Sequence, residues 1–196
     1  MDEELALGKR FWDIKYISNQ IGWDMGEVSP PIKEYIDQIE NKDLAILIPG
    51  GGLSHEAEYI AKQGFTNITV LDISTVLVEK LQEKFKDIPA IKIVEGDFFD
   101  FKGQFDLIIE QTFFCALYPH HREQYVQKMS ELLTTNGRLV GLLFNIDFQG
   151  GPPYGGHIKD YLPLFEKRFK VLKMEECYNS HPARKGNELW LNLQKN

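Results

Sequence analysis

Residues 44–73 read LAILIPGGGLSHEAEYIAKQGFTNITVLDI, and this stretch decides the fold class. The run at 44–48 is apolar throughout, as expected for a strand whose two sheet faces are both covered. Three glycines end the run, and residues 54–63 then carry apolar positions at helical spacing before a second apolar run at 68–73. A strand, a glycine loop, a helix and a strand form a βαβ unit, which predicts a parallel sheet.

The alternation continues along the rest of the chain. Further strands are expected at 90–94, 105–109, 138–144, 170–175 and 188–194, and further helices at 7–16, 32–39, 74–85, 122–133 and 160–165. Only a short polar segment with Pro182 and Gly186 joins the last two strands, which is too little chain for a right-handed crossover. We therefore expect an α/β fold in one domain, residues 1–196, with an antiparallel final pair of strands.

Composition excludes several classes of protein. The chain has 196 residues, of which 43% are hydrophobic and 12% aromatic, so an intrinsically disordered protein is excluded. The net charge of −7 argues against nucleic acid or an anionic membrane as partner. Two cysteines give neither a disulfide framework nor a zinc site, and the acidic N-terminus does not resemble a signal peptide. We expect a soluble cytoplasmic protein without a membrane span or metal site, and a monomer.

Ligands of open parallel sheets bind beyond the carboxyl ends of the strands, so the residues that follow each predicted strand are the first candidates. The first strand is followed by the glycines 50–52, which let backbone approach a ligand closely. Asp72 follows the second strand, 20 residues after Gly52, where a carboxylate typically accepts from the ribose hydroxyls of a nucleotide. The third and fourth strands are followed by acidic, aromatic and amide side chains: Asp97, Phe98, Glu110 and Gln111.

The glycine loop lacks the full G-x-G-x-x-G pattern of dinucleotide sites, because His55 occupies the third glycine position. An adenosine ligand without a pyrophosphate needs only the ribose carboxylate, the close loop and groups for the adenine. S-adenosylmethionine is such a ligand. A nicotinamide-dependent oxidoreductase is the alternative, disfavoured by His55 and by the absence of an evident Tyr-x-x-x-Lys arrangement. A non-catalytic cofactor-binding domain also remains open.

Several motifs in one order resemble the thiopurine methyltransferase family, and more closely its branch of thiol and halide methyltransferases. They are FWDIKY (11–16), GWDMGEVSPP (22–31), ILIPGGGLSHE (46–56), VLDIS (70–74), EGDFFDF (95–101), FDLIIEQTFFCALYP (105–119) and GGPPY (150–154). The resemblance covers about residues 11–193. It implies the Rossmann-like class I methyltransferase fold, a seven-stranded and mostly parallel sheet with an antiparallel last strand and helices on both faces. It also implies that residues 1–40 form a helical, aromatic lid over the cofactor.

The resemblance further implies the residues of the site. The implied contacts to S-adenosylmethionine come from Trp12, Tyr16, Trp23, Gly50, Gly52, Asp72, Asp97 and Phe98, and from Glu110 or Gln111. Arg122 and Tyr154 match positions near the methyl acceptor, and the aromatic clustering adds Phe113 and Phe114. Two departures concern the choice of acceptor: Tyr16 stands where the family often has Trp, and Glu110-Gln111 replaces a common Asp-Tyr. The expected acceptor is a small thiol, thiopurine or halide.

No catalytic residue is assigned, because displacement at an activated sulfonium methyl depends mainly on orientation in a dry cleft. Cys115 lacks a positioned base in the sequence and is interpreted as a buried structural thiol. The histidines do not have the spacing of metal ligands. Arg122 could equally be a surface residue or a partner in a helix-start ion pair.

Overall fold

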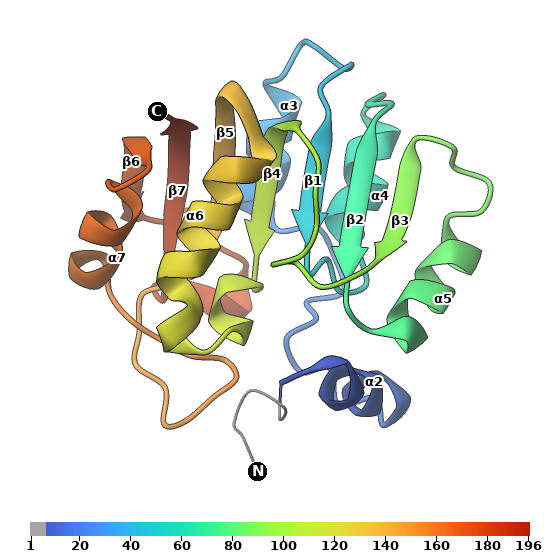
Figure 1. The fold of residues 1–196 in the computed structure, drawn as a ribbon, viewed down its shortest axis with the longest axis horizontal. Helices are drawn as coiled ribbons and strands as arrows, with labels where there is room; N and C mark the ends of the chain where they lie inside the picture. Colours follow the sequence, from blue (N-terminus) through green and yellow to red (C-terminus); the bar gives the residue numbers. More distant parts are fainter. Residues whose placement is uncertain (1–6) are drawn as a thin grey trace.

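A computed structural model describes residues 7–196, and these residues form a single twisted sheet with helices packed on both of its faces (Figure 1). The strands are β1 (Ile46–Pro49), β2 (Ile68–Asp72), β3 (Ile91–Glu95), β4 (Phe105–Gln111), β5 (Leu133–Phe144), β6 (Phe169–Glu176) and β7 (Glu188–Lys195). The helices are α2 (Lys9–Ile17), α3 (Pro30–Asp37), α4 (His55–Lys62), α5 (Thr75–Lys84), α6 (Arg122–Leu132) and α7 (Ile158–Phe165), with the 3-10 turns η1 (Phe114–Ala116), η2 (Pro119–His121) and η3 (Pro182–Arg184).

The sheet has seven strands in the order β3-β2-β1-β4-β5-β7-β6. Strands β1 to β5 pair in parallel, and β7 runs antiparallel between β5 and β6. The chain builds outward from β1 to β3 and then returns to place β4 on the other side of β1. This reversal of strand order opens a crevice at the carboxyl ends of β1 and β4. The predicted α/β class, the seven strands and the antiparallel final strand are confirmed.

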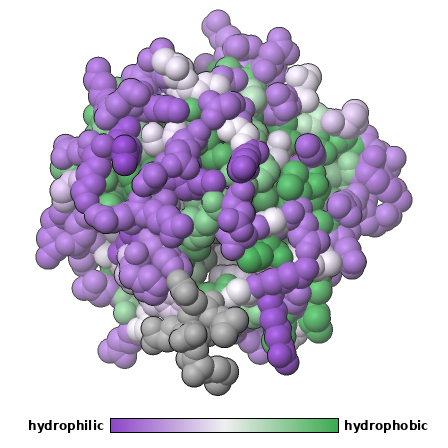
Figure 2. Space-filling model, in the orientation of Figure 1, coloured by the Kyte–Doolittle hydropathy of each residue, from purple (hydrophilic) through white to green (hydrophobic). Residues whose placement is uncertain are grey.

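Strand residues alternate between two cores because successive strand side chains point to opposite faces. Ile46 and Ile48 belong to the core under α3, α4 and α5, whereas Leu47 belongs to the core under α6 and α7. The short central strands β1 and β2 are buried at every position, which fits a sheet covered on both faces. Hydrophilic side chains predominate on the molecular face drawn in Figure 2, with hydrophobic ones visible between them.

Strand β5 differs from its predicted form. A turn at Asn136-Gly137 and a strand from residue 138 were expected, but the strand begins at Leu133. Leu133 pairs with Phe105 and Arg138 with Leu107, so the residues between them form an irregularity in the ladder. Asn136 adopts a positive φ of 64° there. The turn signal therefore marks a bulge within one strand, not the connection before it.

Helix α2 lies beyond the carboxyl ends of β1, β2 and β3, and it contacts α5 (Figure 1). Asp13 fixes this position, because its Oδ1 accepts from Ser74 Oγ at 2.6 Å and from Val76 N at 3.2 Å. Of the predicted N-terminal segment, residues 1–40, the first six residues lie outside the described part of the chain. None of the helices within residues 7–196 has the length and apolar character needed to cross a bilayer.

Candidate functional site

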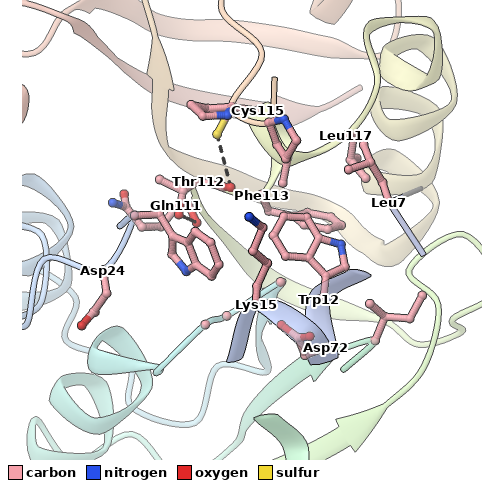
Figure 3. A pocket seen from close by; sticks show the side chains of 18 of the residues that line it. Leu7, Trp12, Lys15, Asp24, Asp72, Gln111, Thr112, Phe113, Cys115 and Leu117 are labelled. Carbon is pink, nitrogen blue, oxygen red and sulfur yellow. Dashed lines mark hydrogen bonds between the residues drawn. The ribbon is translucent and has the colours of Figure 1, made fainter. Parts of the chain in front are cut away.

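A cavity of about 1110 Å³ opens at the carboxyl edge of the sheet. Ligand pockets usually measure about 300–1,000 Å³, so this space suffices for a cofactor together with a small second molecule. Its lining comes from the segments after β1, β2, β3, β4 and β5, from α2 and the loop behind it, and from the β6–β7 connection. Figure 3 shows Asp72 and Cys115 on opposite sides of this space, with Trp12 and Lys15 between them.

The loop after β1 comes so close to the β4 side that it needs glycine. Gly50 has a φ of +57°, and a Cβ on it would lie 2.3 Å from Phe113 Cδ2. Gly52 has a φ of +51° and faces the aromatic residues of the N-terminal segment, because its Cβ position is 3.8 Å from Trp23 Nε1 and 3.9 Å from the Tyr16 hydroxyl. Both glycines line the cavity, and they keep the loop free of side chains there.

Asp72 ends β2 with its side chain in the cavity wall. The residue is 8% exposed, and its Oδ1 accepts from Ser74 N at 2.9 Å. Burial raises the pKa of Asp72 to about 6, against the opposing effect of its backbone hydrogen bonds. The site therefore holds a carboxylate whose charge is only partly compensated, and a ligand with hydroxyl donors would compensate it further.

Asp97 and Phe98 follow β3 and also line the cavity. The Asp97 carboxylate accepts from Phe99 N at 2.7 Å, so it also stabilises its own turn. Phe98 packs edge-on against Phe113 at a centroid distance of 5.0 Å. The two residues thus bring a carboxylate and a flat apolar ring to one side of the cavity.

An aromatic cluster from the N-terminal segment covers the glycine loop. Trp23 meets Trp12 at 5.6 Å and Tyr16 at 5.8 Å between ring centroids, both edge-to-face. All three rings line the cavity. Burial raises the pKa of the Tyr16 hydroxyl, and Asp72 raises it further, so this tyrosine stays protonated.

The β4 side supplies Gln111, Thr112, Phe113 and Cys115 to the lining, and Tyr154 joins them from the loop after β5. Tyr154 N donates to Cys115 O at 2.7 Å, which ties the two segments together. The Cys115 thiol donates to Thr112 O at 3.3 Å (Figure 3), and burial raises its pKa to about 12. Cys115 is therefore a neutral thiol at physiological pH and not an activated nucleophile.

Three predicted site residues are absent from the lining formed by the described chain: Glu110, Phe114 and Arg122. Glu110 is fully buried, and burial raises its pKa to about 7. Its carboxylate accepts from Phe113 N at 2.8 Å, from Phe114 N at 2.9 Å and from the Tyr125 hydroxyl. Glu110 thus fixes the turn after β4, while its neighbour Gln111 faces the cavity.

Phe114 and Arg122 also lie behind the residues that line the cavity. Phe114 is 1% exposed and packs with Tyr125, Tyr161 and the other rings under α6 and α7. The Arg122 guanidinium lies 4.9 Å above the Phe114 ring and donates to Gly155 O at 2.8 Å. Arg122 therefore holds the loop that carries Tyr154 and does not itself line the cavity.

The sequence-based prediction missed Arg184 and Asn187, which line the cavity from the β6–β7 connection. That connection shows no motif, and its polar composition is typical of an exposed loop, yet Arg184 is 9% exposed. Its burial results from packing on the N-terminal segment, because Arg184 Nη2 donates to Trp23 O at 2.6 Å. Within the described residues no group of His, Cys, Asp and Glu has the arrangement of a metal site.

Comparisons with known proteins agree on one family. The family model described as thiopurine S-methyltransferase matches residues 7–192. A probable thiol methyltransferase 2 of Arabidopsis thaliana is 33% identical over 184 residues, which cover 90% of this chain and 81% of the relative. A thiocyanate methyltransferase 1 of Brassica oleracea is 34% identical, with 85% and 76% covered.

The similarity extends to bacterial proteins and to solved structures. A thiopurine S-methyltransferase of Acinetobacter baylyi is 26% identical, covering 92% of this chain and 96% of the relative. Among solved structures, the 1,6-didemethyltoxoflavin-N1-methyltransferase of Burkholderia thailandensis, with S-adenosylhomocysteine bound, superimposes with a TM-score of 0.77 at 15% identity. That match covers 98% of this chain and 89% of the other and agrees with the Rossmann-like fold.

Proposed function

Because the chain belongs to the thiopurine S-methyltransferase family and is an S-adenosylmethionine-dependent methyltransferase of small molecules, we propose that it methylates a soft nucleophile: a thiol, a thiopurine or a halide. The relatives are named thiol, thiocyanate and thiopurine methyltransferases. These names favour the methyltransferase over a nicotinamide-dependent oxidoreductase. The observation that carries the proposal is one cavity with a carboxylate and the glycine loop on one side and aromatic rings with the Cys115 thiol on the other.

The residues of the β1–β3 side fit S-adenosylmethionine. Gly50 and Gly52 leave a cradle without side chains, and the partly compensated Asp72 carboxylate is placed to accept from ribose hydroxyls. Asp97 and Phe98 would hold the adenine. Gln111 Oε1 would accept a hydrogen bond from the methionine end of the cofactor, because this buried oxygen has no partner among the described residues. When bound, the cofactor supplies a methyl group on a sulfonium, already activated for displacement.

The N-terminal segment acts as the lid over this cofactor. Trp12 and Trp23 bring electron-rich rings to the cavity, and such rings attract a sulfonium charge. Asp13 anchors the lid to the first turn of α5, next to Asp72. The lid thereby excludes water and orients the reacting groups, which is the main contribution that a protein makes to such a displacement.

The acceptor would occupy the β4–β5 side, between Phe113, Cys115 and Tyr154. Arg122 and Glu110 position these groups from behind. The lining here is largely apolar, and polarizable nucleophiles lose less hydration on entering it than small hard ones. Thiols with a pKa near 8.5 carry some thiolate at neutral pH, and halides require no deprotonation.

A product assay with labelled S-adenosylmethionine tests the proposal. The acceptor panel contains iodide, thiocyanate, hydrosulfide, a small thiol and a thiopurine. We expect methylated product from at least one of these, and thermal stabilisation of the protein by S-adenosylhomocysteine but not by NAD. A ligand at 100 times its Kd stabilises by about 2.7 kcal/mol, which is readily measured. Absence of product across the panel would refute the proposed acceptor class.

We also propose that the protein works as a cytoplasmic monomer on a small molecule and not on nucleic acid. The two cysteines, Cys115 and Cys177, are both buried and free, which suits a reducing compartment. The net charge of −7 disfavours a polyanionic substrate. Size-exclusion chromatography with light scattering tests the oligomeric state.

A further inference from the structure

His55 is the residue of the glycine motif to which the proposed function gives no role. In the sequence it occupies the position of the third glycine of dinucleotide sites. In the structure it is the first residue of α4, and it borders the cavity. His55 Nε2 lies 2.9 Å from Asp24 Oδ1. Because a glycine at this position would have no side chain, the histidine adds a contact between the start of α4 and the lid.

The contact between His55 and Asp24 is partly shielded from water. Their side chains are 24% and 22% exposed, respectively. A comparable pair on the β5–α7 loop, His157 and Asp147, has 3.2 Å between Nε2 and Oδ2, and the Asp147 side chain is 86% exposed. Solvent screens such an exposed pair strongly, whereas a partly buried pair keeps more of its interaction energy. The His55–Asp24 contact is therefore the stronger of the two.

The first turn of α4 fastens the lid at two points. Residues 18–29, all of them described by the structure, form neither helix nor strand. Asp24 in this segment contacts His55, and Ser29 N donates to Glu56 Oε1 at 3.1 Å. Glu56 is 6% exposed, so its contact is buried. Consecutive residues of α4 thus hold the middle and the end of a segment that has no regular structure of its own.

The His55–Asp24 contact acts on Trp23, whose ring belongs to the lid and lines the cavity. Trp23 Nε1 lies 3.8 Å from the Cβ position of Gly52 in the glycine loop. Asp24 follows Trp23 directly, so a fixed Asp24 restricts the backbone from which this ring enters the cavity. Figure 3 shows the Asp24 side chain directed away from Cys115. The pair therefore acts on the cofactor side, through Trp23, and not on the acceptor side.

A cofactor beneath the aromatic rings can enter and leave only when the lid moves. At one end of the lid, Asp13 holds α2 to α5 through two hydrogen bonds. That contact belongs to a regular helix, whereas Asp24 lies in an irregular segment, and local opening generally starts where regular structure is absent. Because lid motion often limits product release, a contact that closes the irregular segment can set the rate at which the product leaves.

We propose that His55 and Asp24 form a latch on the lid, in which their contact holds Trp23 over the bound cofactor and slows the release of S-adenosylhomocysteine. Both are positioning residues, because they act through Trp23 and the segment around it. The proposal rests on the proposed function, which places the cofactor beneath the aromatic lid, but it does not depend on which acceptor is methylated. Arg184 Nη2 also donates to Trp23 O, at 2.6 Å, so loss of the latch should loosen the segment without releasing it.

A double-mutant cycle on the binding of S-adenosylhomocysteine tests the latch. His55→Leu and Asp24→Ala each remove one partner, and the doubly substituted protein lacks both. We expect each single change to raise the Kd about tenfold, and to accelerate dissociation in stopped-flow fluorescence by a similar factor. The double variant should differ from either single variant by less than about twofold, because one contact cannot be lost twice. Asp147→Ala breaks the exposed pair with His157 and is the matched control, which should keep the parent Kd.

A conservative variant separates the latch from other roles of His55. His55→Gln keeps an N–H donor for Asp24 and should recover most of the affinity that His55→Leu loses. A direct contact of His55 with the cofactor would instead make the effects of His55→Leu and Asp24→Ala additive, and that result overturns the proposal. A purely structural role would lower the melting temperature of the free protein and leave the dissociation rate of S-adenosylhomocysteine unchanged, which overturns it equally.

Hydrogen exchange of the parent protein covers variants that do not fold. S-adenosylhomocysteine should slow exchange of the backbone amides in residues 18–28, and His55→Gln should retain more of this protection than His55→Leu. Protection of α2 alone, without residues 18–28, overturns the latch even if every variant unfolds. Failure of the parent to bind S-adenosylhomocysteine refutes the cofactor placement in the proposed function, and the latch with it. Parent-like binding and release in His55→Leu overturns only the latch and leaves the proposed function standing.

Discussion

Replacement of Asp72 by asparagine should affect the free protein and cofactor binding in opposite directions. The carboxyl group is 8% exposed, and burial raises its pKa from the ordinary value of 3.8 to about 6. One pKa unit corresponds to about 1.4 kcal/mol, so ionised Asp72 costs the free protein on the order of 3 kcal/mol at neutral pH. The amide that replaces the carboxylate would carry no charge and would retain an Oδ1 that accepts from Ser74 N.

The sign of the pH dependence follows from the raised pKa. Between pH 4 and 6 the folded protein holds the Asp72 proton and the unfolded chain releases it, so stability falls as pH rises through this window. Above pH 6 the cost is fully present. We therefore expect Asp72→Asn to unfold at higher denaturant concentration than the parent at pH 8, and the difference to vanish near pH 4.

Cofactor binding should respond in the opposite way. A carboxylate that accepts from ribose hydroxyls contributes about 1.5–3 kcal/mol for each charge-assisted hydrogen bond. Loss of about 2.7 kcal/mol corresponds to a Kd about 100-fold higher for S-adenosylhomocysteine. In the parent, the same Kd should rise below pH 6, because protonation of Asp72 removes the charge that the hydroxyls contact.

The assay combines urea denaturation at pH 4 and pH 8 with calorimetric titration of S-adenosylhomocysteine at pH 8. Asp87→Asn, at an exposed position away from the cavity, is the matched control and should change neither quantity. An unchanged affinity for S-adenosylhomocysteine in Asp72→Asn would refute the ribose role. A loss of stability at pH 8 would refute the argument from burial.

Three further substitutions test the supports of the cavity. Gly50→Ala places a Cβ 2.3 Å from Phe113 Cδ2 at a φ of +57°, so we expect a loss of a few kcal/mol in urea denaturation and a loss of cofactor binding by calorimetry. Tyr125→Phe removes a donor to Glu110, so the pKa of Glu110 should rise above about 7. The free energy of unfolding should fall by about 1–3 kcal/mol, and by more at pH 8.5 than at pH 5.5, where the Glu110 carboxyl is protonated. Asp13→Ala removes the hydrogen bonds from Ser74 and Val76 that join α2 to α5. We expect a clear rise in the Kd for S-adenosylhomocysteine and only a small fall in the melting temperature.

The sequence predicted the order and type of the elements because each strand is marked by local features. Glycines end the first strand, Ser74 caps α5 through its side-chain oxygen, and the apolar runs alternate at lengths typical of strands and helices. The predicted start of β5 was wrong because the true start depends on pairing with β4, which local sequence patterns do not show. Leu133 joins the sheet only because Phe105 lies opposite it.

The prediction of the site residues depended on one topological rule, and what the prediction left open follows from the limits of that rule. Ends of parallel strands meet at one edge, so Asp72 and Asp97 could be placed without coordinates. Glu110 and Gln111 are successive residues of β4, and their side chains point in opposite directions, so the sequence left the choice between them open, and Gln111 is the one that lines the cavity. Arg184 could not be found, because its burial arises from a contact with Trp23, 161 residues earlier.

The distribution of charge in the cavity bears on how methyl transfer would be accelerated. Carboxylates face the proposed cofactor side, at Asp72 and Asp97, whereas Arg184 faces the proposed acceptor side. With an anionic acceptor, a sulfonium and an anion lose their charges as they react, so the transition state is less polar than the reactants. A dry cavity disfavours separated charges more than a polar one does, and it therefore lowers the barrier for this reaction.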